Sequence, residues 1–428
     1  MKFFFLPKDI VHWYLQDTVT RLSSTITTDV VIVGGGMAGL SAAQNFVAKG
    51  LRVTLIEKYF CGAGASGKSS GFITPNAELS LHDLVHFYGN DEAKKLWDFV
   101  TGGVKYIKNN IQQYGIACDY QQQDTLIVSN TNRSFSTNIQ KEYAAYQKLG
   151  YTSALYNTQE LSAHIGSSAY TGGMWYPDSF GINGYYYCKA MKAVLQALGV
   201  TIYEDTPVTA VDHNKVITPY GTIKAKYIVV CADYGALNLG NLSSILYHVQ
   251  TFLMVSAPLS DVQVKKIFPS KLYMVWDTDL IYHYYRLIEG NRLMLGGASL
   301  WYTYAQEEKH NNWYNARLLQ HYFQKKFPDI AITFPYIWPG MLGITKDILP
   351  IAGFDQHIPS VYYVAAATGL PWAAALGTYS VDCILHGDNR FDQYFSPYRH
   401  NTLGAGIQAI LGTKLTFALS HFLRVGSL

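Results

Sequence analysis

The sequence has few charges and few cysteines for its length. Charged residues make up 15% of its 428 positions and the net charge is +3, without a lysine and arginine block, so nucleic-acid binding is not expected. The five cysteines are scattered, odd in number and lack a C-x-x-C pair, which favours reduced thiols. These absences predict a cytoplasmic, globular protein.

Long hydrophobic runs are missing at both ends. The opening MKFFFLPK is stopped by Pro7 and is too short for the apolar region of a secretory signal peptide, so none is expected. Residues 403–428 are mostly apolar, but Lys414, His421 and Arg424 make them a poor bilayer span. A docked helix or hairpin is favoured for this extension, and a peripheral membrane contact stays open.

Glycine, by contrast, is concentrated in one informative stretch, DVVIVGGGMAGLSAAQ. The apolar run from Val30 predicts a buried strand, followed by a tight turn and a helix that starts at Met37. Gly34, Gly36 and Gly39 have the G-x-G-x-x-G spacing: the first permits the turn, the second admits a pyrophosphate, and the third lets the helix pack on the strand. Free N–H groups at such a helix start bind phosphates.

An acidic residue completes this nucleotide-binding unit. Residues 51–56 predict a second buried strand, and Glu57 follows it, roughly 20 residues beyond the glycines. A carboxylate there accepts hydrogen bonds from both ribose hydroxyls and repels a 2′-phosphate. The unit predicts a bound dinucleotide and leaves NAD and FAD both open.

Other patterns place further elements along the chain. Apolar residues between 91 and 114 recur at three and four positions, which is typical of an amphipathic helix. Residues 185–203 predict a helix, a turn and a strand, and residues 280–297 predict a hairpin turned at Glu289, Gly290 and Asn291. The loop CGAGASGKSSGFITP after Glu57 is either a wall for a phosphate or ring edge, or a flexible connector.

Six separated stretches resemble the FAD-dependent D-amino acid oxidase superfamily, most closely its γ-glutamylputrescine oxidase branch, near the glycine and sarcosine oxidases. Their order and spacing extend the resemblance over nearly the whole chain. The stretches are residues 29–57, GASGKSSG at 64–71, GVTIYEDTPVTAV at 199–211, YIVVCADYGA at 227–236, YYRLIEGNRLMLGG at 284–297, and WPGMLGITKDILPIAGF with VYYVAAATG between 338 and 369.

This resemblance implies a noncovalently bound, extended FAD. It places Glu57 at the adenosine ribose and the Val208 backbone at the adenine. Some relatives tether flavin through a histidine in the loop where this chain has Lys68, Ser69 and Ser70. The residues expected around the cofactor are Gly34, Gly36, Met37, Ala38, Gly39, Glu57, Lys58, Gly64, Ala65, Ser66, Gly67, Lys68, Ser69, Ser70, Gly71, Val208, Cys231, Ala232, Gly235, Gly340, Gly343, Asp347, Gly369, Leu370, Pro371 and Trp372.

The resemblance also implies the fold class and the domain organisation. It is an α/β fold, with a Rossmann-like FAD-binding domain from residues 26–84, 180–244 and 336–398. A mainly antiparallel-β substrate domain would comprise residues 85–179 and 245–335, with residues 399–428 as an apolar C-terminal extension. Relatives often carry a Gly-His-Gly type of loop beneath the flavin, where this chain has Gly369 to Trp372. The shape of the substrate pocket therefore does not transfer.

The expected reaction is oxidation of an amine or amino acid at its C–N bond. Hydride transfer to flavin N5 would give an imine that water hydrolyses, and oxygen or another acceptor would take the electrons. Tyr282, Tyr284 and Arg286 alternate on one strand face, so the guanidinium could anchor a substrate carboxylate while the phenols line the pocket. An ordinary ion pair is the other role open to Arg286.

Three rival functions stay open at this stage. They are a membrane-surface dehydrogenase that passes electrons to a quinone, a flavin-binding protein without turnover, and an NAD-only enzyme. His82 and His86 lie four positions apart, but no third ligand of suitable spacing follows, so no metal is expected.

Overall fold

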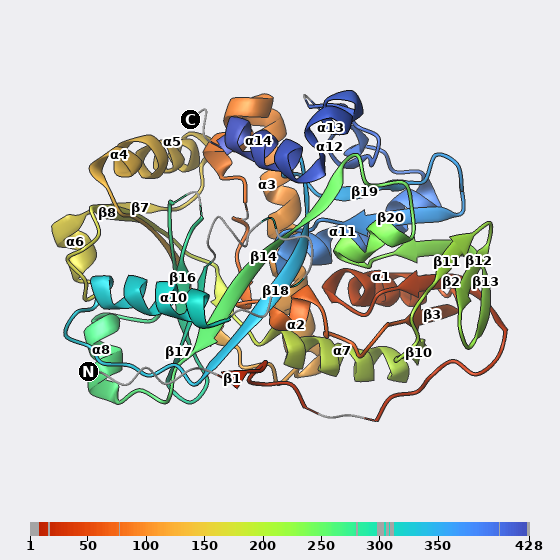
Figure 1. Cartoon of the computed structure of the whole chain (residues 1–428), viewed down its shortest axis with the longest axis horizontal. Helices are drawn as coiled ribbons and strands as arrows, with labels where there is room; N and C mark the ends of the chain where they lie inside the picture. Colours follow the sequence, from red (N-terminus) through yellow and green to blue (C-terminus); the bar gives the residue numbers. More distant parts are fainter. Residues whose placement is uncertain are drawn as a thin grey trace.

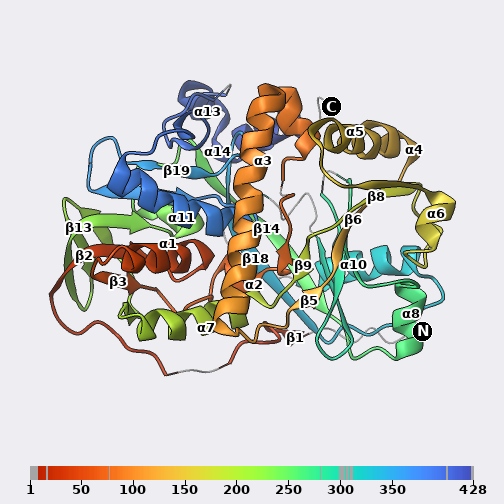
Figure 2. The same ribbon diagram turned by 180° about the vertical axis from the view of Figure 1, so that it is seen from behind.

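The computed structural model describes residues 8–15, 18–76, 78–279, 281–297, 304, 308, 312–401 and 403–425. Two large β-sheets lie side by side, with helices packed around them (Figure 1). The long helix α3 (Leu81–Tyr114) runs along the junction of the two halves on the side seen in Figure 2. The strand ends that meet at this junction position the candidate site.

The first large sheet has eight strands and a parallel core. Val30 to Val33 are buried, as expected for a parallel strand covered on both faces. The parallel strands pair in the order β10 (Thr201–Tyr203), β3 (Val53–Ile56), β2 (Ile26–Val33), β13 (Gly221–Val230) and β20 (Val361–Ala365). Antiparallel additions are β12 (Lys215–Thr218) and β11 (Ala210–Asp212) beside β13, and β19 (Ile351–Phe354) beside β20. The predicted α/β, Rossmann-like fold class is confirmed.

Helices α1 (Met37–Ala48), α7 (Gly184–Ala197) and α11 (Leu370–His386) pack with α3 against this sheet. Their close approach depends on glycines, because a Cβ on Gly377 would lie 2.2 Å from the Ala38 carbonyl oxygen. A Cβ on Gly103 would lie 2.0 Å from the Pro371 carbonyl oxygen. Helix α3 begins earlier than the predicted residue 91, at a capping box formed by Ser80 and Asp83, and passes through a kink at Gly89.

The second large sheet has nine strands and is mostly antiparallel. The hairpin predicted at residues 289–291 is confirmed, with left-handed φ values of 72° at Gly290 and 51° at Asn291. The strand order is β1 (Lys8–Asp9), β18 (Tyr336–Thr345), β14 (Leu246–Val255), β17 (Arg292–Gly297), β16 (Tyr284–Ile288), β15 (Tyr273–Asp277), β6 (Asp124–Ser129), β8 (Gly172–Tyr176) and β7 (Ala154–Asn157). Helices α8 (Asp261–Ile267) and α10 (Asn312–Lys326) pack beside this sheet.

Strand β18 joins the two halves of the molecule. It pairs with β14 over ten residue pairs, so it belongs to the nine-stranded sheet, although the sequence boundary at 336 grouped it with the FAD-binding domain. The smaller elements are α2 (Ala65–Lys68), β4 (Phe72–Ile73), β5 (Gln121–Gln122), α4 (Asn132–Ser134), a π-helix (Phe135–Ile139), α5 (Gln140–Leu149), α6 (Thr158–Ser162), β9 (Phe180–Gly181), a 3₁₀ helix (Asp233–Asn238) and α12 (Asp392–Phe395).

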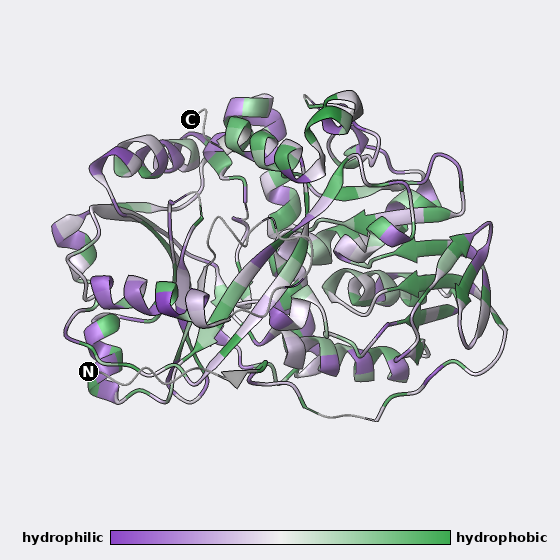
Figure 3. Ribbon diagram, in the orientation of Figure 1, coloured by the Kyte–Doolittle hydropathy of each residue, from purple (hydrophilic) through white to green (hydrophobic). Residues whose placement is uncertain are grey.

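The C-terminal extension forms α13 (Ala405–Leu411) and α14 (Thr413–Val425). Phe417 of α14 is fully buried and packs against Tyr247, and His421 Nε2 lies 2.7 Å from the carbonyl oxygen of Thr345. Both helices are rich in apolar residues, as the colouring of Figure 3 shows, and several of these, including Ile410 and Phe422, are exposed. Among the described residues, no helix combines the length and apolarity needed to cross a membrane.

Candidate cofactor and substrate site

A cavity of about 1620 Å³ lies where the two large sheets meet. Its wall includes the turn after β2, the end of β20 and parts of β14, β16 and β18. Small-molecule sites have volumes of roughly 300–1,000 Å³. The cavity therefore has room for an extended dinucleotide together with a second, smaller ligand.

The glycine turn at one end of the cavity has the geometry that pyrophosphate binding needs. Gly34 has a φ of 113°, and a Cβ there would lie 2.4 Å from the carbonyl oxygen of Cys231. Gly36 caps α1 without a side-chain hydrogen bond, and Gly36, Met37 and Ala38 line the cavity. The N-terminal end of α1 thus presents backbone N–H groups and its positive dipole to a ligand.

Glu57 lies beside this turn, at the end of β3. Its Oε2 accepts a hydrogen bond from Gly35 N at 2.7 Å, and its Oε1 accepts one from Tyr59 N at 3.0 Å. Burial raises the pKa of Glu57, and these amide hydrogen bonds oppose that shift. Glu57, Lys58 and Val208 line the cavity, so the structure brings together the residues expected at the adenosine.

The glycine- and serine-rich loop forms an ordered wall of the cavity. Trp13 Nε1 donates to Gly67 O at 2.8 Å, and Trp338 Nε1 donates to Lys68 O at 3.1 Å. Lys68 forms an ion pair with Glu308 at 2.8 Å. Of the two roles open for this loop in the sequence, the hydrogen bonds to distant indoles favour a fixed wall over a flexible connector.

The junction of β20 and α11 forms a further part of the cavity wall, one strand away from the glycine turn. Gly369 has a φ of 112° and caps α11 without a side-chain hydrogen bond, and Pro371 lies in the first turn. The half-buried Asp233 accepts hydrogen bonds from Gly343 N at 2.8 Å and Ala366 N at 3.1 Å. Asp233 thereby ties the ends of β13, β18 and β20 around the cavity, a role that the sequence did not reveal.

The structure separates the three residues that the sequence predicted to bind the substrate. Tyr282 and Tyr284 line the cavity, and burial raises the pKa of Tyr284 to about 12. Arg286 is buried behind the wall, where Nε donates to Ser70 O at 2.8 Å and Nη2 donates to Ile182 O at 2.6 Å. Burial lowers the pKa of Arg286 to about 10, so it stays charged at neutral pH. The guanidinium thus faces backbone carbonyls and does not line the cavity.

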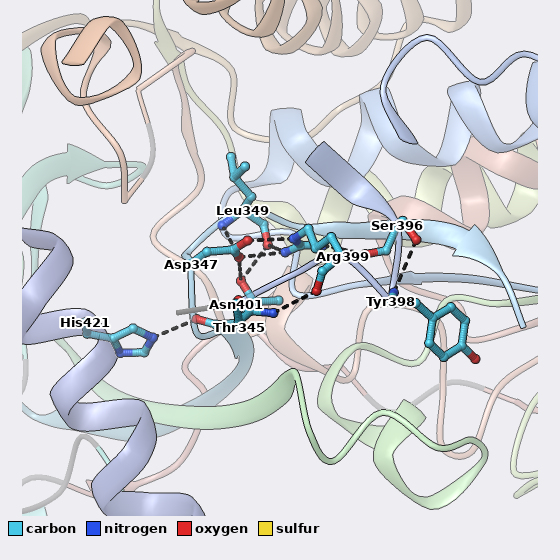
Figure 4. A network of polar contacts seen from close by, with 8 residues as sticks. All are labelled: Thr345, Asp347, Leu349, Ser396, Tyr398, Arg399, Asn401 and His421. Carbon is cyan, nitrogen blue, oxygen red and sulfur yellow. Dashed lines mark hydrogen bonds and ion pairs between the residues drawn. The ribbon is translucent and has the colours of Figure 1, made fainter. Parts of the chain in front are cut away.

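Most of the residues predicted around the cofactor line this cavity, and five do not. Asp347 forms an ion pair with Arg399 instead, with a distance of 2.6 Å from Nε to Oδ2 (Figure 4), and so fixes the start of the C-terminal extension. Trp372 lines a small neighbouring cavity. Backbone packing is the role of Gly39, Gly67 and Gly343, since a Cβ on each would lie less than 3.0 Å from a neighbouring atom. The predicted residues that line the cavity are Gly34, Gly36, Met37, Ala38, Glu57, Lys58, Gly64, Ala65, Ser66, Lys68, Ser69, Ser70, Gly71, Val208, Cys231, Ala232, Gly235, Gly340, Gly369, Leu370 and Pro371.

The cavity wall also contains groups that the sequence reasoning missed. Glu78 accepts a hydrogen bond from the Tyr282 hydroxyl at 2.8 Å, and Phe422 of α14 lines the cavity. Potential metal-ligand atoms of Asp277, Asp279 and His283 lie within 4.8 Å of one another. The D-x-D spacing could have drawn attention to this cluster, whereas the prediction of no metal considered only the pair of histidines near residue 82.

Comparisons with known proteins agree with this geometry. A family model described as "DAO: FAD dependent oxidoreductase" matches residues 29–380. Gamma-glutamylputrescine oxidoreductase of Escherichia coli is 26% identical over 358 residues, which cover 81% of each chain. The probable oxidoreductase OrdL of Haemophilus influenzae is 26% identical over 410 residues, which cover 92% of this chain and 91% of the relative.

Solved structures show the same fold. The crystal structure of glycine oxidase from Geobacillus kaustophilus aligns with a TM-score of 0.75 at 20% identity, covering 88% of this chain and 99% of that chain. The matched residues 29–380 span well over half of the chain and confirm the resemblance drawn from the sequence. The chain therefore belongs to the DAO family of FAD-dependent oxidoreductases, whose cofactor fits the glycine turn and the cavity beside it.

Proposed function

We propose that the chain oxidises the C–N bond of an amine or amino acid in this cavity. The observation that carries the proposal is a single cavity that extends from the glycine turn at Gly34 and Gly36 to the phenol-lined wall at Tyr282 and Tyr284. The names of the relatives, an amine oxidoreductase and a glycine oxidase, support this substrate class. FAD, when bound, supplies a hydride acceptor at N5.

The chain's own residues would bind the cofactor, orient it and stabilise the charge that develops on it. The backbone N–H groups at the start of α1 would hold the diphosphate, and Glu57 would hold the adenosine ribose. The N-terminus of α11, at Gly369, lines the cavity, and its helix dipole would stabilise negative charge on a reduced flavin bound there. The substrate imine leaves the aromatic wall and is hydrolysed by water, and oxygen or another acceptor takes the electrons.

The purified protein is expected to be yellow and to lose its flavin absorbance when mixed anaerobically with a substrate amine or amino acid. A panel of both classes, followed by detection of aldehyde or keto acid, measures this. A yellow protein that no member of the panel bleaches would favour a flavin-binding protein without turnover, and a colourless protein would favour an NAD-only enzyme.

A dehydrogenase at a membrane surface is the second candidate, because α13 and α14 expose apolar side chains next to the cavity. Ile410 is 85% exposed, and Leu419 and Phe422 are exposed and also line the cavity. A quinone dissolved in the bilayer could reach the cavity along this surface. The apolar residues exposed on these helices are Ile407, Ile410, Leu411, Leu415, Leu419, Phe422 and Leu423.

The triple variant Ile410→Ser, Leu411→Ser, Leu415→Ser tests the membrane candidate in a vesicle-flotation assay. If the candidate holds, partition onto lipid vesicles falls by at least about tenfold, because burying each of these exposed side chains in the lipid would contribute up to roughly 1.5–3 kcal/mol. Val262→Ser is the matched control, since Val262 is 66% exposed on α8 in the other half of the molecule. Equal partition of wild type and triple variant would dismiss this candidate.

A further inference from the structure

Glu78 is a carboxylate in the cavity wall whose role the proposed reaction leaves unassigned. Its Oε1 accepts a hydrogen bond from the Tyr282 hydroxyl at 2.8 Å. It also lines the small neighbouring cavity together with Thr368 and Trp372, next to the junction of β20 and α11. Glu78 therefore lies at the end of the cavity where the substrate, rather than the adenosine, is expected.

Other carboxylates of the wall already have strong partners. Glu57 and Asp233 accept backbone N–H groups, as described above, and Glu142 accepts those of Leu81 at 3.0 Å and His82 at 2.7 Å. Glu308 is paired with Lys68. Within the part of the chain that the structure describes, Glu78 has no ion pair with a lysine or arginine, and burial raises its pKa against the lowering effect of Tyr282.

Aromatic rings surround this end of the cavity. Phe72 stacks on Trp276 at a centroid distance of 5.9 Å and meets Tyr284 edge-on at 5.9 Å. Tyr282 and Tyr284 lie 5.7 Å apart, and all four rings line the cavity. A wall of π faces beside a carboxylate attracts an ammonium group through cation–π and ionic interactions.

An anion finds little to bind at the same place. The Arg286 guanidinium donates to the carbonyls of Ser70 and Ile182 behind the wall, and Lys68 is neutralised by Glu308. A substrate carboxylate placed beside Glu78 would meet a like charge, which is unfavourable. Among the described residues, Lys58 and Lys414 also line the cavity, but neither is among the groups that shift the pKa of Glu78.

We propose that Glu78, held by Tyr282 and flanked by Phe72, Trp276 and Tyr284, binds the ammonium group of a cationic amine substrate that lacks an α-carboxylate. This inference rests on the proposed function and narrows it to amines. The geometry assigns Glu78 to specificity: the carboxylate faces the charge of the substrate while the rings pack on its methylene groups.

The ionisation of Glu78 gives the proposal a pH signature. A bound cation stabilises the charged carboxylate, so affinity for a permanent cation rises by about tenfold per pH unit below the raised pKa of Glu78 and levels off above it. The phenols of Tyr282, Tyr284 and Tyr304 have raised pKa values and stay neutral over this range. Other titratable groups line the cavity: Glu142, whose pKa burial raises to about 7, and His82 and His421, whose pKa values burial lowers. These groups and the carboxylates of Asp277 and Asp279 are present in every variant, so a Glu78 variant is the necessary reference.

Tetramethylammonium is the probe, because its charge does not depend on pH and it has no nitrogen lone pair for oxidation. The FAD-loaded protein is titrated at constant ionic strength while flavin absorbance and tryptophan fluorescence are recorded. Glu78→Gln is expected to weaken binding by about 10- to 100-fold, as for the loss of a charged partner, and to remove the pH dependence. Glu289→Gln is the matched control, since it removes an exposed carboxylate at a hairpin turn outside the cavity.

Equal binding by wild type and Glu78→Gln would overturn the inference, and so would binding of glycine as tight as that of methylammonium. Retained flavin and an unchanged thermal midpoint in Glu78→Gln exclude misfolding, and Glu78→Asp, which keeps the charge, is expected to recover part of the affinity. If amino acids reduce the flavin and amines without a carboxylate do not, this inference is refuted and the proposed function stays intact. If the protein carries no flavin, the proposed function fails, and a change in tryptophan fluorescence that is lost in Glu78→Gln still shows whether the cation binds beside Trp276.

Discussion

Gly39→Ala is expected to abolish FAD retention and to lower the free energy of unfolding by about 3 kcal/mol or more. A Cβ on Gly39 would lie 1.9 Å from the carbonyl oxygen of Gly34 and 3.3 Å from Ile32 Cγ2. The first neighbour is backbone, so α1 must move away from β2 to relieve the contact, and overpacking that displaces backbone costs at least about 1–3 kcal/mol. The same movement opens the turn that is expected to hold the diphosphate.

Urea denaturation measures the stability of this variant, and flavin absorbance after gel filtration measures its FAD content. The control is an alanine variant of another helix glycine, Gly102. Gly102 in α3 is exposed, and a Cβ there would meet nothing within 4 Å. Gly102→Ala is expected to stabilise the protein by about 0.5–1 kcal/mol through the higher helix propensity of alanine and to keep the flavin. Normal flavin content in Gly39→Ala would show that this turn is not part of the cofactor site.

The nucleotide-binding unit could be predicted from the sequence because its signals are local. A strand, a turn that needs positive φ and a helix start follow one another between Val30 and Gly39, and each depends on steric rules within a few residues. The hairpin at residues 289–291 was predictable for the same reason. The structure confirms these elements, and their spacing along the chain fixes the position of the glycine turn against the cavity.

The substrate end of the cavity could not be predicted in this way, because its contacts join distant parts of the chain. Strand alternation places Tyr284 and Arg286 on one face, but it does not tell how deep each side chain lies. Arg286 meets carbonyls more than 100 positions away, at Ser70 and Ile182, and this packing turns it into part of the wall. Glu78 follows no recognisable motif, and its importance comes from Tyr282, 204 positions later.

The C-terminal extension illustrates a third case, in which the type of element was predictable and its position was not. The apolar pattern favoured a docked helix or hairpin and left a peripheral membrane contact open, and in the structure α14 buries Thr416 and Phe417. Its contact with the cavity depends on β18, whose Thr345 carbonyl meets His421, and on the ion pair between Asp347 and Arg399 (Figure 4). Those partners are tertiary, so the sequence alone could not place α14 beside the site.

Arg286→Lys is expected to lower the free energy of unfolding by about 3–6 kcal/mol and to weaken FAD retention. The lysine keeps the positive charge, but its single ammonium cannot reproduce the fork that reaches both Ser70 O and Ile182 O. Each hydrogen bond that involves a charged group contributes about 1.5–3 kcal/mol, and the carbonyls left behind lie in a buried place. The loop from Gly64 to Gly71 then loses the contact that fixes its last residues behind the cavity.

Substrate anchoring by Arg286 would give a different result, so one experiment decides between the two roles. An anchor predicts a raised KM for carboxylate substrates with the thermal midpoint and flavin content unchanged. The structural role predicts the reverse: loss of stability and flavin, with the KM of the remaining holoenzyme little changed. Arg52→Gln provides the matched control, because the Arg52 side chain is 69% exposed in its pair with Asp29 and such surface pairs contribute about 0–1 kcal/mol. A stable, flavin-loaded Arg286→Lys enzyme with a selectively raised KM would return Arg286 to the substrate site.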